Sequence, residues 1–179
     1  MYTIKLDEND FLEFQLFRAS KSKRIKRKRI TTWLFLTIST FILAYLFMAT
    51  GNNTVRNYFI VLGVVSLFFF PYYQRWRYRK HYLKHVRENL HNQFLKEAHI
   101  KFDAEYLVTY DDKNESKIDI AEIDIINETS EHIFVKTKPG QSLIIPKRFV
   151  DVDKFINGLN QITSDAGILW KRDLSWKWR

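Results

Sequence analysis

Acidic side chains gather in one stretch of the chain, where Asp119, Glu122, Asp124 and Glu128 fall within ten residues. Carboxylates grouped in this way can act as metal ligands or as a general acid and base. These four, however, alternate with isoleucine in a pattern that is typical of a half-buried strand. The sequence therefore predicts the solvated face of a sheet and no catalytic carboxylate pair.

Histidine and cysteine give no stronger indication of chemistry. His81 and His85 are four residues apart and share one helix face, but we expect a solvated pair there and no metal site. His132 stands alone before a predicted strand. The chain has zero cysteines, which excludes thiolate metal sites, disulfides and cysteine nucleophiles. It also has no glycine-rich phosphate loop and no G-x-S-x-G elbow. We predict that the protein is not an enzyme and holds no metal or cofactor.

The distribution of charge is more informative than its total. The chain carries 29 Lys and Arg against 20 Asp and Glu, a formal net charge of +9. Residues 18–29 hold eight bases and no acid, residues 75–101 are net +6, and residues 102–165 are net −6. A basic protein suggests nucleic acid or an anionic membrane as its partner. Because the bases flank apolar segments and the folded part is acidic, we predict the membrane and no nucleic acid.

Two apolar segments are long enough to cross a bilayer. Residues 30–50 are 21 consecutive residues without a charge, and residues 57–74 are another 18. A spanning helix needs about 20 such residues, and neither segment shows the polar face of a soluble helix. The connection at residues 51–56 is short, so the sequence predicts an antiparallel hairpin. No ionisable residue lies mid-span, which argues against a transport pathway.

The basic residues that flank the two spans predict the orientation of this hairpin. Small residues within the spans predict how its helices pack. Eight Lys and Arg precede the first span and four follow the second, whereas the connection has one, Arg56. The positive-inside rule places both termini in the cytoplasm, with Trp33 and Trp76 at the same interface. Within the spans, small side chains allow close approach and a proline favours a kink. These residues are Ala44, Gly63, Ser66 and Pro71.

The segments outside the hairpin predict an α+β domain. Residues 2–6 alternate as a short strand, and Asp7 caps a helix that contains Phe11 and Phe14, a piece expected to dock on the C-terminal domain. Residues 75–101 predict a basic amphipathic helix that continues the second span and carries apolar residues at helical spacing as far as Ala98.

From residue 102 the apolar period changes to two. Turn signals at 111–114 and 138–141 and a phase slip at residues 121–122 separate four or five antiparallel strands. Pro146 ends the last strand, and Asp151 or Asp153 caps a closing helix. The predicted fold class is an α+β membrane protein, with a transmembrane hairpin and a small antiparallel β-meander or partly open barrel closed by a C-terminal helix. The predicted segments are 1–29, 30–74, 75–101, 102–165 and a tail at 166–179.

Candidate contact residues lie in two places. After Pro146, Phe149 is expected to pack inward while Lys147 and Arg148 project, either as a plain solvated turn or into contact with lipid headgroups or a partner. The tail concentrates three of the five tryptophans beside four bases, so it is expected to lie on the anionic membrane surface. The domain is correspondingly expected to build its core without tryptophan. The candidate residues are Lys147, Arg148, Trp170, Lys171, Arg172, Trp176, Lys177 and Trp178.

Two stretches carry a family resemblance. Residues 142–159, SLIIPKRFVDVDKFINGL, run from an apolar strand through a Pro-Lys-Arg-Phe turn into a capped helix, and residues 118–128 form an isoleucine-rich strand pair. This arrangement, together with the hairpin, resembles the YcxB-like family of bacterial membrane proteins. The resemblance implies a pleckstrin-homology-like domain on a bacterial inner-membrane anchor. It implies a scaffold or binding role, with no catalytic residues to carry over.

Two functions remain open from the sequence. The first is a bacterial inner-membrane protein that presents a cytoplasmic, non-catalytic binding or scaffold module to a protein partner. The alternative is an immunity protein that neutralises a membrane-targeted toxin, a role that suits a small two-span protein with an unusual tail. The gene neighbourhood is the observation that separates the two.

Overall fold

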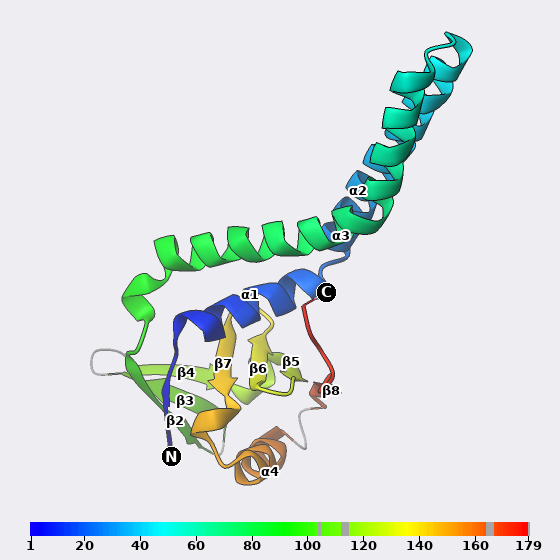
Figure 1. The fold of residues 1–179 in the computed structure, drawn as a ribbon. Helices are drawn as coiled ribbons and strands as arrows, with labels where there is room; N and C mark the ends of the chain where they lie inside the picture. Colours follow the sequence, from blue (N-terminus) through cyan, green and yellow to red (C-terminus); the bar gives the residue numbers. More distant parts are fainter. Residues whose placement is uncertain (104, 112–114, 164–166, 179) are drawn as a thin grey trace. The chain divides into compact units, whose positions relative to one another are not determined.

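The computed structural model describes residues 1–103, 105–111, 115–163 and 167–178 (Figure 1). The expected turn residues 112–114, the last two residues of the predicted domain at 164–165, the first tail residue at 166 and Arg179 lie outside the described residues. The chain divides into two compact units. We call Met1–Phe14 with His85–Lys177 the domain unit, and Gln15–Lys84 with Trp178–Arg179 the hairpin unit. Each is described by itself.

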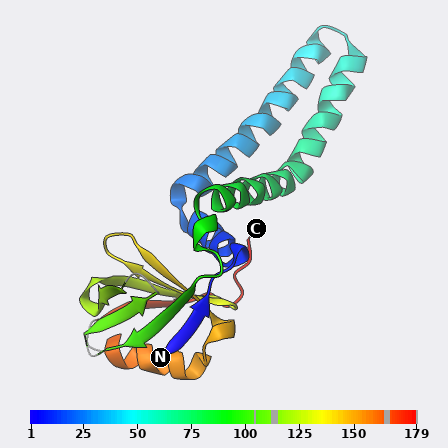
Figure 2. The same ribbon diagram turned by 90° about the vertical axis from the view of Figure 1, so that its left-hand side faces the viewer.

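Two long helices form the hairpin unit. α2 (Lys23–Ala49) and α3 (Asn53–Asn89, of which the part up to Lys84 belongs to this unit) run antiparallel and side by side (Figure 2). Both are long and apolar enough to span a membrane, as the sequence predicts. The turn between them uses Gly51 at φ +71°, where a glycine lacks the steric penalty of a side chain. The Asn52 side chain then accepts a hydrogen bond from the Val55 amide at 3.2 Å and caps α3.

Small side chains bring the two helices together, as expected. Ala44 and Ser66 are buried, and the Ser66 hydroxyl lies 3.2 Å from the Thr37 hydroxyl of the other helix. Gly63 faces the Phe41 ring so closely that a Cβ atom there would lie 2.9 Å from Phe41 Cζ. Pro71 lies inside α3, which changes direction along its length in Figure 2. The missing proline N–H removes one helical hydrogen bond and allows such a bend.

The N-terminal segment docks on the domain unit, which confirms the prediction. β1 (Tyr2–Lys5) pairs antiparallel with β2 (Glu97–Phe102), and Ile4 faces Ala98 in that register. α1 (Glu8–Lys21) begins with a reciprocal cap. The Asp10 amide donates to Asp7 Oδ1 at 2.9 Å, and the Asp7 amide donates to Asp10 Oδ2 at 2.8 Å. These two bonds satisfy amides that the first turn of a helix otherwise leaves without acceptors.

The strands of the domain unit form two four-stranded sheets. The first has the order β1-β2-β3-β4, with β3 at Tyr106–Tyr110 and β4 at Glu115–Asp119. The second has the order β7-β6-β5-β8. Its strands are β5 (Ile123–Glu128), β6 (His132–Thr137), β7 (Ser142–Pro146) and β8 (Leu169–Arg172). A 3-10 turn at Ile120–Glu122 separates β4 from β5 and confirms the predicted break. The described strands form no closed barrel.

The core of the domain unit lies among both sheets and helix α4 (Val152–Thr163), drawn in orange in Figure 1. α4 contributes Phe155 and Leu159, both fully buried, and the Asp151 side chain caps its first turn as predicted. The strands contribute mainly isoleucine, the β-branched residue that suits a buried sheet face. These residues are Ile4, Ile100, Ile118, Ile123, Ile126, Ile133 and Ile145.

Two sequence expectations about these elements are wrong. The basic helix ends at Asn89, and after a 3-10 turn at His91–Gln93 the chain forms strand β2 rather than helix. Alternating burial in β2 places Ala98, Ile100 and Phe102 on the core side, and the pairing of β2 with β1 and β3 outweighs a short stretch of helical spacing. The tail also enters the fold, because β8 pairs parallel with β5, so the sheets are not a simple antiparallel meander.

Candidate functional site

The candidate residues at one end of the second sheet converge on Glu128. This carboxylate ends β5 with its side chain only 6% exposed, so it is not on the solvated face that the alternation predicts. Lys147 Nζ lies 2.8 Å from Oε1, while Arg172 Nε and Trp170 Nε1 lie 3.1 Å and 3.3 Å from Oε2. Three of the candidate contact residues are therefore held by one carboxylate of the same unit.

The electrostatics of this Glu128 cluster favour the ionised form. Burial alone acts to raise the pKa of Glu128, but the hydrogen bond and charge of Lys147, together with Trp170 and Arg172, hold that pKa below its ordinary value. Lys147 itself is only 14% exposed on its side chain. Its ammonium therefore completes an internal ion pair instead of projecting into solvent as expected.

Arg148 is anchored by Asp10 from the first turn of α1. Its Nη1 and Nη2 donate to the two carboxylate oxygens of Asp10, each at 2.6 Å, in the bidentate geometry that is strongest for this pair. Nε2 of His132 lies 2.8 Å from Asp10 Oδ1, and both of these side chains are buried. The Arg148 side chain stays 45% exposed and also contacts Asp7 at 3.2 Å.

The Asp10 cluster keeps its acid charged despite burial. Desolvation acts to raise the pKa of Asp10, but hydrogen bonds from His132 and Arg148 and from the Asp7 amide hold the pKa well below its usual range. The Phe134 ring stacks on the His132 ring at 5.5 Å between centroids, which encloses the pair on that side. No single stretch of the sequence indicates this cluster, because Asp10 lies 122 residues before His132 and 138 residues before Arg148.

Phe149 differs from its predicted orientation. Its side chain is exposed, and the inward position is taken by the next residue, Val150. The Arg148 guanidinium lies over the Phe149 ring, 4.7 Å from its centroid. The 3-10 turn at Lys147–Phe149 explains the change, since it rotates the chain between β7 and α4 by about one residue relative to an extended path.

The tail residues divide between the two units. Trp170 packs against the core of the domain unit, so the expectation of a core without tryptophan is wrong. Lys171 and Lys177 are exposed, and the Trp176 amide donates to the Asp173 carbonyl at 3.0 Å. Trp178 belongs to the hairpin unit.

Trp178 joins the two helices of the hairpin unit. Its Nε1 donates to the Arg75 carbonyl of α3 at 3.1 Å, and the Arg29 guanidinium of α2 lies over the indole, 5.0 Å from a ring centroid. The Trp178 side chain therefore contacts both helices at the basic residues that adjoin their apolar parts, Arg29 and Arg75.

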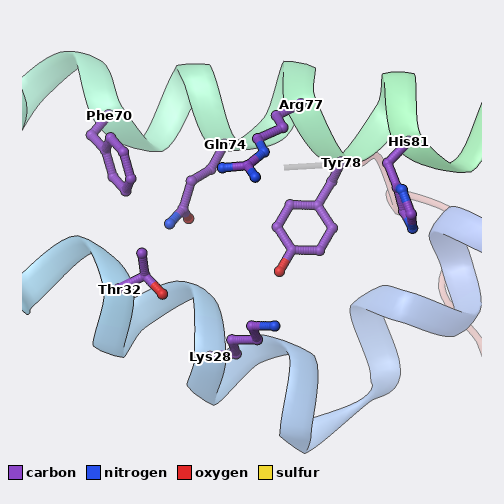
Figure 3. Close-up of a pocket in the computed structure, with 7 residues that line it drawn as sticks. All are labelled: Lys28, Thr32, Phe70, Gln74, Arg77, Tyr78 and His81. Atoms are coloured by element: carbon purple, nitrogen blue, oxygen red, sulfur yellow. The ribbon is translucent and has the colours of Figure 1, made fainter.

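A groove opens between α2 and α3 beside this contact (Figure 3). It has a volume of about 330 Å³, and α3 supplies most of its walls. In Figure 3 Gln74 and Tyr78 point from α3 toward α2, and Arg77 and His81 lie at the same side of the helix. The residues that line it are Lys28, Thr32, Phe70, Gln74, Arg77, Tyr78 and His81. We call it the Gln74 groove.

Gln74 also borders a second groove between the same helices. Its side chain is buried and donates from Nε2 to the Arg29 carbonyl at 3.1 Å, a bond that ties α3 to α2. The second groove includes Trp33, Pro71 and Arg75 in its lining. Trp33 Nε1 and Arg75 Nε are buried N–H donors with no acceptor in the described part of the chain.

The acidic and histidine residues considered first do not assemble into a site. Asp119 accepts from the Ala121 amide at 2.7 Å as a turn cap, and Asp124 pairs with Lys136 at 2.5 Å. The His85 ring lies 3.0 Å from Asn89 Nδ2 one turn later. Within the described ranges, no three His, Asp or Glu residues are grouped as metal ligands.

Comparison with protein families matches residues 102–159 to the model of the YcxB-like proteins. The chain carries a YcxB-like domain. Comparison with curated proteins and with solved structures finds no match in either set. The matched range contains β3 to β7 and most of α4, together with Glu128, His132 and the Lys147–Phe149 turn.

Both ion-pair clusters combine the YcxB-like domain with segments outside the matched range. Asp10 comes from the N-terminal helix, while Trp170 and Arg172 come from strand β8. The polar groups of each cluster are turned toward one another, so each cluster joins a flanking segment to the YcxB-like domain through charge-assisted hydrogen bonds. The Gln74 groove, in contrast, directs donors and positive charges into open space.

Proposed function

We propose that this chain is a two-pass protein of the bacterial inner membrane that presents its YcxB-like domain in the cytoplasm as a non-catalytic binding module. One observation carries the proposal. Only 17% of the most apolar stretch of α2 and 11% of that of α3 is buried. The core helix of a water-soluble protein would be mostly buried. Hydrocarbon is the solvent that suits such exposed apolar helices, and a helix satisfies its own backbone polar groups there.

The charge around the spans supports the cytoplasmic orientation. Twelve Lys and Arg flank the two spans at the ends away from the connection, and Arg56 is the single base within it. Such a difference across a short hairpin retains the basic side in the cytoplasm. Residues 102–165, which contain the YcxB-like domain, follow that basic side in the chain, and their net charge of −6 disfavours contact with the anionic leaflet.

The surface of the Lys147–Phe149 turn supports a binding role. The Phe149 ring is exposed and stacks under the half-exposed Arg148, so an aromatic face and a guanidinium edge are offered together. Aromatic residues and arginine are the side chains most enriched in the centres of protein interfaces. We therefore propose a protein partner that contacts this turn, with Asp10 holding Arg148 in place.

Topology is tested by placing single cysteines in a chain that has none. We expect Asn52→Cys, in the hairpin turn, to react with a membrane-impermeant maleimide in intact cells. Asn157→Cys, exposed on α4, should react only after the inner membrane is permeabilised. The protein should also stay in the membrane during alkaline carbonate extraction. The reverse labelling pattern, or release by carbonate, would refute the membrane topology.

The binding role is tested with a photo-crosslinking amino acid at Phe149 in the full-length membrane protein. A discrete protein adduct is expected from that position and not from Ser116, which is also exposed, on β4. Arg148→Lys keeps the charge but loses the bidentate anchor, so it should weaken the adduct. Equal adducts from both positions, or none from Phe149, would contradict a binding surface at this turn.

A further inference from the structure

The Gln74 groove has a graded composition along the hairpin. Phe70 and Thr32 line the end nearer the turn of the hairpin, while Lys28, Arg77 and His81 lie farther along the two helices. Gln74 adds an amide between these two ends, and Tyr78 adds a phenol between Arg77 and His81. The lining therefore passes from an aromatic ring through a neutral amide to a region that holds the positive charges and a phenol. This is the order of groups met along a phospholipid, from its acyl chains to its phosphate.

The groove has no acidic counter-charge from its own unit. Residues 15–84 contain 14 Lys and Arg and no Asp or Glu, and all 20 acidic residues of the chain lie in the domain unit. Lys28 and Arg77 thus line one cavity without a carboxylate in its wall. Bringing like charges together near an apolar region raises their free energy, and a bound anion offsets that repulsion.

The second groove supplies an independent observation. The indole N–H of Trp33 and the Nε–H of Arg75 are buried beside Gln74 without acceptors in the described residues. A buried donor that lacks an acceptor is unfavourable and rare in native proteins. Both nitrogen atoms are enclosed in this structure, so an acceptor-rich ligand in the groove would satisfy them after a small movement of the Trp33 or Arg75 side chain. Phosphate oxygens are acceptors of this kind.

We infer that the two grooves around Gln74 bind the phosphodiester of an anionic phospholipid. The inference rests on the proposed membrane insertion, because the grooves begin where the apolar part of α2 and α3 ends. Basic pockets between membrane helices at their cytoplasmic ends are suited to acidic headgroups. A free phosphate ion shares the same chemistry with Lys28 and Arg77, but it makes no use of Phe70 or of the neighbouring apolar helix faces.

The test uses the full-length protein in nanodiscs of phosphatidylcholine that contain one-fifth phosphatidylglycerol, with retained lipid measured by native mass spectrometry. The wild type should retain phosphatidylglycerol over phosphatidylcholine. A Lys28→Gln/Arg77→Gln variant should lose about 30-fold of that preference, because each base near an anionic headgroup contributes about fivefold. The matched control, Arg79→Gln/Lys80→Gln, removes the same charge from α3 at residues that line neither groove. It measures the diffuse attraction of bases to anionic headgroups and should reduce the preference clearly less than the groove variant.

Further arms separate the sources of phosphate and the causes of failure. Millimolar inorganic phosphate should leave the retained lipid unchanged, and displacement by it would overturn the lipid assignment. Tyr78→Phe preserves the packing of the ring and should lower retention by about fivefold through one lost hydrogen bond. Equal loss in the groove and control variants would overturn the site in favour of a diffuse charge effect. A protein that resists carbonate extraction but shows no lipid preference overturns this inference alone, whereas release by carbonate overturns the proposed function.

Discussion

The domain unit and the hairpin unit use charge in opposite ways. The domain unit holds all 20 acidic residues, and Asp10 and Glu128 draw lysine, arginine and histidine side chains into buried clusters. The hairpin unit holds basic residues and no acid in residues 15–84. Paired charges join particular segments of the chain to one another. A run of charges of one sign instead attracts a surface or ligand of the opposite charge. The following predictions test that difference, from the largest expected effect to the smallest.

Acidification should have the largest effect, and only on the domain unit. Both Asp10 and Glu128 have a lowered pKa in the folded state, so each stabilises the fold at pH values above its unfolded-state pKa of about 4. That stabilisation is lost as the pH falls through the folded-state values. We expect urea midpoints of the domain unit, measured by tryptophan fluorescence in micelles, to drop below pH 4 with little change between pH 7 and pH 5.

Variants of the two acids identify the source of that pH dependence. Glu128→Gln and Asp10→Asn should each flatten the decline below pH 4, because the missing carboxyl no longer takes up a proton on unfolding. A decline that keeps the wild-type slope in both variants would assign the pH dependence to other groups.

Asp10→Asn should be the most destabilising single substitution of a charge. It leaves the buried His132 without a charged partner and Arg148 with only the exposed Asp7, and breaking a buried pair costs about 3–5 kcal/mol. Since Arg148 is partly exposed, we expect a loss of about 2–4 kcal/mol. Hydrogen exchange of the β5 and β6 amides in the full-length protein measures it. Asp7→Asn is the control, because asparagine keeps the helix cap and the exposed Asp7–Arg148 pair contributes less than about 1 kcal/mol.

Glu128→Gln should come next, with a loss of about 2 kcal/mol, because the amide keeps a hydrogen bond from Trp170 but leaves the mostly buried Lys147 unpaired. The same exchange measurement applies, and faster exchange should extend to β8 because Arg172 also loses its partner. Asp124→Gln, at an exposed pair with Lys136, is the matched control and should change stability by less than about 1 kcal/mol. Equal effects at the two positions would contradict the importance of burial.

Ser66→Ala in the hairpin unit should have the smallest effect. It removes the hydroxyl contact with Thr37, and such bonds between membrane helices average about 0.6 kcal/mol. Steric trapping of the unfolded hairpin in bicelles measures a difference of this size. Gly63→Ala is the informative companion, because its new Cβ would meet the Phe41 ring at 2.9 Å and should cost more than the lost hydroxyl. If Ser66→Ala costs more than Gly63→Ala, polar contact and not close packing holds the helices together.

The local elements of this fold could be predicted from the sequence because their signals are local. The apolar lengths of α2 and α3, the phase slip before Ile123 and the cap at Asp151 each lie within one element or at its boundary. Strand β2 is the exception among them. A short helical spacing continues past Asn89, and only the pairing of Ala98 and Ile100 with β1 settles it as a strand.

The candidate sites were harder to predict because they depend on distant pairings. Whether Arg148 projects or is anchored depends on Asp10, 138 residues away, and nothing near Arg148 in the chain indicates that partner. Glu128 looks like a solvated residue until β8 brings Arg172 beside it. The Gln74 groove had a compositional signal, the complete absence of acids from residues 15–84, but its walls come from two helices whose register the sequence does not specify.

The pairing of β1 with β2 also sets the order of events during synthesis. Residues 2–5 leave the ribosome before their partners at 97–100, which emerge only after both apolar helices have been made. At about 5–20 residues per second, the first strand waits on the order of 5–20 s for its neighbour. The second sheet waits longer, since β8 is the last strand to appear. Synthesis of both hairpin helices therefore precedes completion of the domain, and a nascent chain stalled before residue 97 carries a β1 strand without its partner.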